Sequence, residues 1–321
     1  MVDHIEIPRP RVILGCGTFG GIGGALQLVG KGLNRQSALA TLDEAAALGI
    51  DFWDTAESYA GGESELAIGA WLATRPGPLA AQIRLATKTA PSKEADRLFD
   101  SQYVQRKLDG SLARLRRERV DLMMAHAICP RTPIETMVEA FGAVVESGKA
   151  GQVGCCNVGP ETLIAALDTA RRMNLPGFTW VQNGFSLLAP LADAEVREIC
   201  RERGLTYCAY SPLAGGVLAG KYRRGEPFPP DTRMALRPDG LALSERTHDA
   251  LDTLRAMASA RNVESAVLAL AWVLSHPDFI SPVVGPSRYA PHVAHVAKSM
   301  EIELTQFERE QLSSAFATIE E

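Results

Sequence analysis

The 321-residue chain lacks several features that would direct it to a membrane or a nucleic acid. No window offers the ~20 apolar residues that a transmembrane helix needs. The N-terminal residues show no basic region followed by an apolar core of signal-peptide length. Basic and acidic residues, 33 and 38 of them, are intermixed without long runs of one sign. We therefore expect a cytoplasmic protein without an extended nucleic-acid or membrane surface.

The six cysteines also lack a pattern that would indicate a disulfide framework or a metal site. No CxxC spacing is present, and no His/Cys spacing suggests a zinc site. Several cysteines lie in apolar runs, where cysteine behaves as a small buried hydrophobe. Cys155 and Cys156 are adjacent, so on a strand their side chains would point to opposite faces. We expect reduced thiols and no bound metal.

Eight short apolar runs alternate with longer stretches in which apolar residues recur at helical spacing. Such alternation predicts parallel strands joined by crossover helices, and eight strands are the number that closes a barrel. We therefore predict an α/β fold, a (β/α)8 TIM barrel that forms a single domain over residues 1–321. An open doubly wound sheet is the alternative. The predicted strands are 11–15, 50–54, 83–88, 120–126, 151–157, 178–182, 205–210 and 279–284.

One connection is long and irregular. It covers residues 211–240, after the seventh strand, and is rich in Gly, Pro and Arg. Long loops on compact domains are usually functional, so we expect this one to contribute to a binding site.

Four ionisable residues stand at or just after the C-terminal ends of predicted strands: Asp54, Tyr59, Lys88 and His126. In a barrel of this kind these ends converge on one mouth. Each residue alone has an ordinary structural explanation. Together they are better explained by a shared site, because an unpaired Lys or Asp at a buried mouth would be costly.

The chemistry of the four groups is complementary. A Tyr hydroxyl with a pKa near 10 is a poor acid at neutral pH. The ammonium of Lys88 would lower the pKa of Tyr59, and a carboxylate beside Lys88 would keep it charged. A neutral His126 would orient a substrate carbonyl. Gly61 and Gly62 allow a tight turn that tips the phenol inward. This set suits proton transfer to a carbonyl oxygen while a hydride reaches the carbon.

These residues also carry a family resemblance. The segments DTAESYAGGESE, LATK, the strand ending in AH, VQN, AYSPLAGGVLAGKY and VVGPSR resemble the aldo-keto reductase superfamily, from about residue 11 to the end. SPLAGGVLAGKY resembles the branch that includes bacterial reductases and potassium-channel β subunits. The resemblance implies a (β/α)8 barrel with a catalytic tetrad of Asp54, Tyr59, Lys88 and His126. It also implies NADP(H) or NAD(H) bound across the mouth without a Rossmann domain.

The resemblance further implies which residues hold the cofactor. Asn157 and Gln182 would hydrogen-bond the carboxamide, and Tyr210 would stack on the nicotinamide. Arg288, beside Ser287, would hold the adenosine 2′-phosphate, and its guanidinium favours NADP(H) over NAD(H). The implied cofactor residues are Gly17, Thr18, Asp54, Cys156, Asn157, Gln182, Tyr210, Ser211, Pro212, Leu213, Gly215, Lys221, Arg233, Gly285, Ser287, Arg288 and His295.

The chain departs from the family's pattern at three places. Cys156 stands where the family usually has Ser, and the usual adenine-binding Gln and Asn are replaced around Pro291 and His295. The segment AICPRT after His126 lacks the acidic or tryptophan-containing forms common there. Because mouth loops build the substrate pocket, substrate specificity is not carried over.

The leading hypothesis is an NADP(H)-dependent carbonyl reductase or alcohol dehydrogenase that acts on a small molecule. Phe19, Trp53 and Phe185 are candidates for an apolar substrate wall, although the position of Trp53 within a strand favours core packing for it. One alternative is a redox-sensing or regulatory subunit that binds nucleotide with little turnover. Another is a barrel aldolase with Lys88 as a Schiff-base amine. The sequence names neither the substrate nor the direction of reaction, and leaves open whether the chain forms a homo-oligomer.

The assignment of the 2′-phosphate to Arg288 gives a prediction about cofactor choice. Arg288→Ala should weaken the binding of NADPH more than that of NADH, because only NADPH carries the phosphate that the guanidinium would hold. Fluorescence titration with both nucleotides measures this difference. Equal losses for the two would remove the reason for preferring NADP(H).

Overall fold

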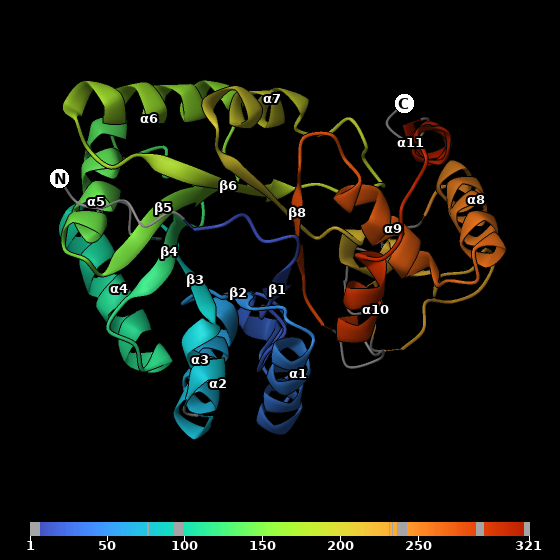
Figure 1. Cartoon of the computed structure of the whole chain (residues 1–321), viewed down its shortest axis with the longest axis horizontal. Helices are drawn as coiled ribbons and strands as arrows, with labels where there is room; N and C mark the ends of the chain where they lie inside the picture. The colour runs from blue at the N-terminus through green and yellow to red at the C-terminus, as the bar shows by residue number, and fades with distance from the viewer. Residues whose placement is uncertain are drawn as a thin grey trace.

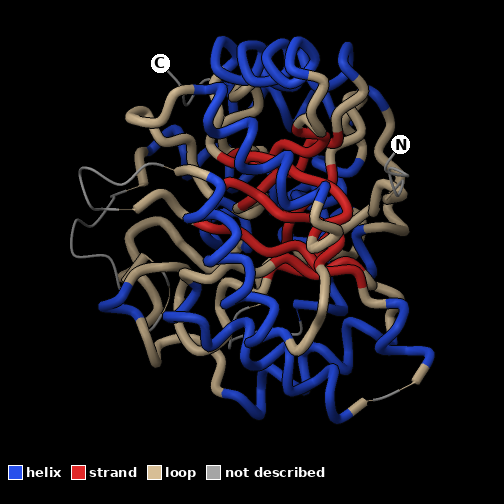
Figure 2. The backbone as a smooth tube through the Cα atoms, turned by 90° about the vertical axis from the view of Figure 1, so that its left-hand side faces the viewer, coloured by secondary structure: helices blue, strands red, loops and turns tan. Residues whose placement is uncertain are grey.

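The computed structural model describes residues 7–75, 77–92, 99–230, 232, 234–235, 243–286 and 292–317. Eight parallel strands form a closed barrel in which β1 also pairs with β8, so the TIM barrel prediction is confirmed and the open sheet is wrong. Figure 2 shows the strands at the centre with helices around them. The strands are β1 (Ile13–Gly15), β2 (Phe52–Asp54), β3 (Arg84–Thr89), β4 (Val120–Ala125), β5 (Ala150–Cys156), β6 (Phe178–Gly184), β7 (Thr206–Tyr210) and β8 (Ser281–Val284).

Helices follow the strands and cover the outside of the barrel. The last four helices gather beside β8, at the right of Figure 1. The helices are α1 (Arg35–Ala47), α2 (Glu63–Thr74), α3 (Pro78–Gln82), α4 (Ser101–Leu115), α5 (Ile134–Glu146), α6 (Pro160–Met173), α7 (Ala194–Arg203), α8 (Glu245–Ala260), α9 (Ser265–Leu274), α10 (His292–Ser299) and α11 (Gln306–Ala317). Three short 3-10 turns, η1 (Leu26–Leu28), η2 (Tyr59–Gly62) and η3 (Ala214–Ala219), lie in loops.

The core has two layers, one between strands and helices and one inside the barrel. Phe52 on β2 and Trp180 on β6 are not on neighbouring strands, yet their rings stack at 5.2 Å. Such a contact requires both rings to fill the barrel interior. Cys155 belongs to the outer layer and Cys156 to the inner one, which confirms that they point to opposite faces. All six cysteines are buried free thiols.

The loop after β1 shows why the barrel is not a Rossmann fold. Gly15, Gly17 and Gly20 have the G-x-G-x-x-G spacing, which in dinucleotide-binding sheets opens a helix directly after the first strand. Here the chain instead folds back, with the amide of Gly20 donating to the carbonyl of Leu33 at 2.8 Å, and α1 begins only at Arg35. The glycines therefore form a loop at the barrel mouth.

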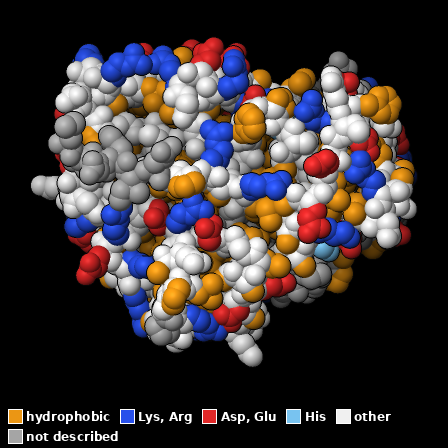
Figure 3. All heavy atoms as spheres, in the orientation of Figure 1, with side chains coloured by type: hydrophobic (Ala, Val, Ile, Leu, Met, Phe, Trp, Pro, Cys, Tyr) orange, Lys and Arg blue, Asp and Glu red, His pale blue; other side chains and the backbone are white. Residues whose placement is uncertain are grey.

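The surface carries mixed charge. On the face in Figure 3, Lys and Arg side chains lie among Asp and Glu side chains. Within the described part of the chain, no helix has the length and apolar character needed to cross a membrane.

Because α2 packs closely on α4, we expect a substitution as small as glycine to alanine at their contact to cause a large loss of stability. A Cβ added at Gly69 in α2 would lie 2.1 Å from the carbonyl oxygen of Arg114, whereas one at Gly142 in α5 would meet its neighbours at 3.5 Å. Gly69→Ala should lower the free energy of unfolding by about 3 kcal/mol, because the backbone of α2 or α4 must shift to relieve this overlap.

Gly142→Ala is the matched control. It should leave stability unchanged or raise it by up to about 1 kcal/mol, since Ala favours helix over Gly. Urea denaturation of both variants measures the two effects. Similar stabilities would mean that α2 and α4 do not approach as closely as described.

Candidate active site

A cavity of about 420 Å³ opens at the C-terminal ends of the barrel strands. Tyr59, His126 and Asp54 of the predicted tetrad line it, while Lys88 is buried beneath. Its wall also contains many of the predicted cofactor residues. These are Gly17, Thr18, Asp54, Cys156, Asn157, Gln182, Tyr210, Ser211, Pro212, Leu213, Gly215, Lys221 and Gly285.

A buried ion pair forms the base of the cavity. Asp54 ends β2 and Lys88 lies near the end of the adjacent β3, and the two residues are 2% and 1% exposed. The ammonium donates to both carboxylate oxygens of Asp54, at 2.7 and 2.6 Å, and to the carbonyl of Thr55 at 2.8 Å. An ammonium has three N–H donors, so all are committed. Burial is the largest single effect and acts to lower the pKa of Lys88, but Asp54, together with smaller effects of Tyr59 and Cys156, raises this pKa on balance.

Tyr59 lies directly over this pair. The Nζ of Lys88 is 4.9 Å from the centroid of the phenol ring, so a full positive charge faces the aromatic group. Burial is the larger effect, however, and raises the pKa of Tyr59 to about 12, although the Lys88 charge acts to lower it. The expected net lowering of this pKa is therefore wrong. The phenol is protonated at neutral pH and is available as a proton donor.

An unusual backbone turn holds Tyr59 in place. The three residues that follow it, Ala60, Gly61 and Gly62, have φ values of 50°, 67° and 99°. Successive left-handed residues reverse the chain within η2, and glycine adopts this conformation without steric cost. The predicted role of the two glycines in a tight turn is confirmed. The phenol is turned toward Gly17, where an added Cβ would meet its ring at 3.4 Å.

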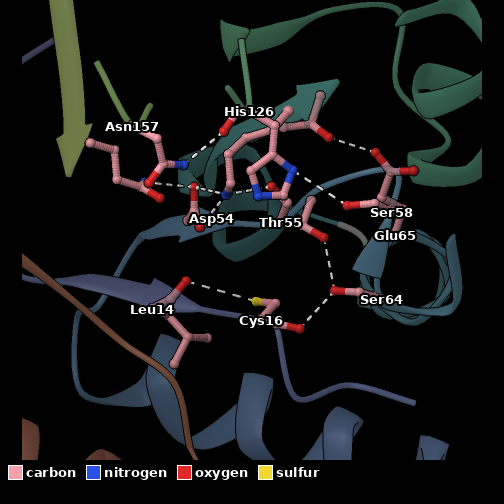
Figure 4. Close-up of polar contacts among 12 residues, drawn as sticks. Leu14, Cys16, Asp54, Thr55, Ser58, Ser64, Glu65, His126 and Asn157 are labelled. Carbon is pink, nitrogen blue, oxygen red and sulfur yellow. Dashed lines mark hydrogen bonds and ion pairs between the residues drawn. The ribbon is translucent and has the colours of Figure 1, made fainter. Parts of the chain in front are cut away.

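Buried polar groups at the start of α2 anchor this turn (Figure 4). Glu65 is fully buried and accepts hydrogen bonds from Thr87 and from the Nε of Arg114, both at 2.6 Å. The hydroxyl of Ser64 donates to the carbonyl of Cys16 at 2.8 Å. Thr87 precedes Lys88 on β3, so the helix after the turn is tied to the strand that carries the ammonium. Sequence reasoning missed this ion pair between the buried Glu65 and Arg114, whose side chain remains 29% exposed.

His126 follows β4 and stands against Tyr59, with ring centroids 5.5 Å apart and planes at 81°. Burial and then the charge of Lys88 lower the pKa of His126 to about 3. The imidazole is therefore neutral at physiological pH, as expected. Its Nδ1 lies 3.3 Å from the hydroxyl of Ser58.

The residues expected to hold a carboxamide form a connected set across the mouth. Asn157 donates from Nδ2 to the carbonyl of His126 at 2.9 Å and accepts from the hydroxyl of Tyr210 at 2.8 Å. Gln182 donates to Asp54 at 3.1 Å. Cys156 lies beside them, and burial raises the pKa of its thiol to about 12. This part of the cavity wall therefore consists of uncharged hydrogen-bonding groups.

Lysine side chains also line the cavity. Lys221, which could have been an ordinary surface charge, lines the wall, and burial lowers its pKa. Lys31 and His292 also line it, and sequence reasoning named neither. His295 is one turn away on α10 and lies 3.8 Å from Glu264, outside the cavity wall. His295 was already predicted from the sequence, so the α-helical spacing between the two is a signal that could have directed attention to His292.

Other predicted residues fall elsewhere. Phe19 and Phe185 are not on the cavity wall; both are buried in the core, with Phe185 stacked on Trp272 at 5.5 Å, so their expected role in a substrate wall is wrong. The remaining cofactor residues, Arg233, Ser287 and Arg288, lie outside the described residues. Among the described residues, no group of three or more His, Cys, Asp or Glu side chains could hold a metal ion.

The geometry also bears on the aldolase hypothesis. A Schiff-base lysine must be a neutral amine to attack a carbonyl. Lys88 is paired with Asp54, its three donors are engaged, and its pKa is raised. The site therefore holds this amine in its unreactive ammonium form.

Comparison with known proteins identifies a matching family and several similar proteins. The model of the aldo/keto reductase family matches residues 11–316. Similar proteins include an uncharacterised oxidoreductase, YrpG, of Bacillus subtilis, 33% identical over 86% of this chain and 85% of that protein. An aldo-keto reductase of Schizosaccharomyces pombe named with NADP(+) is 30% identical over 79% of this chain and 75% of its own.

Two further likenesses were found. A probable voltage-gated potassium channel β subunit of Oryza sativa is 30% identical over 83% of this chain and 82% of its own. The solved structure of a glycerol dehydrogenase from Gluconobacter oxydans superposes with a TM-score of 0.80 at 24% identity, covering 99% of this chain and 94% of that one. This last likeness bears on the fold alone.

The lowered pKa of His126 predicts a pH dependence of stability. The folded protein protonates this group near pH 3, whereas the ordinary value is 6.5. The unfolded chain therefore binds more protons between these values, and His126 makes the fold less stable as pH falls through that window. His126→Gln should reduce the loss of stability between pH 7 and pH 5 by about 1–2 kcal/mol.

Urea denaturation of both proteins at the two pH values measures this. An acid-induced loss of the same size in the variant would show that His126 accepts a proton in the folded protein without penalty.

Proposed function

Since this chain belongs to the aldo/keto reductase family and is an oxidoreductase of that family, we propose that it reduces aldehyde or ketone carbonyls to alcohols, or the reverse, with NADP(H) in preference to NAD(H). The observation that carries the proposal is the stack of Tyr59 over the buried Lys88–Asp54 pair, 4.9 Å from Nζ to ring centroid, at the base of the cavity. Beside it stands the neutral imidazole of His126.

The cavity wall fits a nicotinamide dinucleotide. It presents the amides of Asn157 and Gln182 and the ring of Tyr210, groups suited to a carboxamide and a flat heterocycle. It also presents the ammonium groups of Lys31 and Lys221, which suit phosphate groups. When bound, the nucleotide supplies or accepts a hydride. The preference for NADP(H) rests on the resemblance at Arg288 and on the relative named with NADP(+).

The chain's own residues would then handle the proton. Tyr59 holds a proton at neutral pH, with its pKa near 12, and would donate it from the hydroxyl to the carbonyl oxygen during reduction. The Lys88 ammonium, kept charged by Asp54, would stabilise the phenolate that this transfer leaves behind. His126 would hydrogen-bond the same oxygen and orient it. Alcohol oxidation needs the phenolate as a base, so it should be favoured at higher pH.

A spectrophotometric assay tests the proposal. Purified protein mixed with NADPH and a panel of aldehydes and ketones should lose absorbance near 340 nm with at least one carbonyl. Tyr59→Phe should abolish this loss, because the ring remains but the proton donor is gone, while nucleotide affinity stays near that of the parent protein.

The controls separate the alternatives. Tight nucleotide binding without oxidation for any carbonyl, activated aromatic aldehydes included, would favour a redox-sensing or regulatory role. An equal loss of nucleotide binding in Tyr59→Phe would show that the phenol is structural. Covalent trapping of Lys88 by borohydride with a carbonyl would instead support an aldolase.

A further inference from the structure

His126 is held from two sides by residues of other loops (Figure 4). On one side its backbone carbonyl accepts a hydrogen bond from Asn157 at 2.9 Å. On the other, its ring nitrogen Nδ1 lies 3.3 Å from the hydroxyl oxygen of Ser58. The edge contact with Tyr59 fixes the ring plane. Ser58 and Tyr59 are consecutive, so one short segment presents the phenol and contacts the imidazole.

The neutral state of His126 makes the choice of tautomer matter. A neutral imidazole carries one N–H and one lone pair, on either nitrogen. A carbonyl oxygen only accepts hydrogen bonds, so orienting it requires the proton on Nε2 and the lone pair on Nδ1. The ring therefore needs a donor at Nδ1. Lys88 does not compete at the imidazole, because its three N–H groups are donated to Asp54 and Thr55.

We propose that Ser58 is a positioning residue that donates its hydroxyl proton to Nδ1 of His126 and thereby keeps the Nε2–H tautomer facing the cavity. The benefit of this tautomer rests on the proposed carbonyl reduction, whereas the contact between Ser58 and His126 is observed independently of it. Within the described part of the chain, the Ser58 side chain makes no other hydrogen bond, so its proton is available to the imidazole.

The segment around Ser58 is fixed well enough to direct the hydroxyl. The carbonyl of Ser58 accepts from the amide of Gly61 at 3.3 Å. The preceding amide, of Glu57, donates to the carbonyl of Lys88 at 3.1 Å. Gly24 packs against the side chain, since a Cβ added there would lie 3.2 Å from the Ser58 oxygen. The hydroxyl thus lies between the loop after β1 and the imidazole ring.

Tautomer populations can be read directly by NMR. The full-length protein is prepared with [15N]histidine, and long-range proton–nitrogen correlation spectra distinguish protonated from unprotonated ring nitrogens. His126→Gln identifies the His126 signals. In the parent protein, Nε2 should carry the proton and Nδ1 should not.

Ser58→Ala and Ser58→Thr form the matched pair. Ser58→Ala removes the donor, so the population with the proton on Nδ1 should rise. The kcat for carbonyl reduction with NADPH should fall about fivefold, the usual effect of one lost neutral hydrogen bond, with unchanged nucleotide affinity. Ser58→Thr keeps a hydroxyl at the same place and should restore both the parent tautomer and most of the kcat.

Three results would overturn this role: a parent protein with its proton on Nδ1, a Ser58→Ala variant with an unchanged tautomer, or a threonine variant that behaves like the alanine one. A fall in kcat without a tautomer change would likewise assign Ser58 to packing. If the parent protein reduces no carbonyl while the tautomer shifts as expected, carbonyl reduction fails and the tautomer control by Ser58 stands.

Discussion

The ammonium of Lys88 lies almost wholly out of water, and the site is arranged around keeping it charged. Removing such an ion from solvent costs several kcal/mol unless good geometry and further hydrogen bonds compensate. Asp54 and the carbonyl of Thr55 together use every N–H of the group. The pairing of β2 with β3 brings both partners to adjacent positions, since Asp54 lies opposite Ala86, two residues before Lys88. Loss of this register would leave a buried charge unpaired and Tyr59 without its neighbour.

Much of the fold could be predicted from the sequence, because the regular alternation of apolar runs records which segments are buried on both faces. Each predicted strand is present, with ends that differ by no more than two residues. The Gly15, Gly17 and Gly20 spacing shows the limit of local patterns. It is compatible with a helix-opening turn, but the following residues fold back toward Leu33, and this depends on contacts that spacing does not encode.

The motifs predicted that Asp54, Tyr59, Lys88 and His126 would come together, but they did not predict which way the pKa of Tyr59 would shift. The direction of the pKa shift of Tyr59 depends on the balance between burial and the charge of Lys88, and burial follows from packing that no motif records. Phe185 was misassigned for a similar reason: a residue just beyond a strand end can turn to the mouth or to the helices, and here it stacks on Trp272. The contacts of His292 and Ser58 likewise depend on how distant loops meet.

The distribution of charge within the cavity has one further consequence. Around Tyr59, the charges of Lys88 and Asp54 cancel and His126 is neutral, so this part of the cavity has no net charge. Elsewhere on the wall, Lys31 and Lys221 add positive charge to a chain that is acidic as a whole, with a net charge of -5. Dissolved salt screens exposed charges far more than buried ones. Higher ionic strength should therefore weaken the attraction between these two ammonium groups and the anionic nucleotide that we propose, while the buried Lys88–Asp54 pair is little affected.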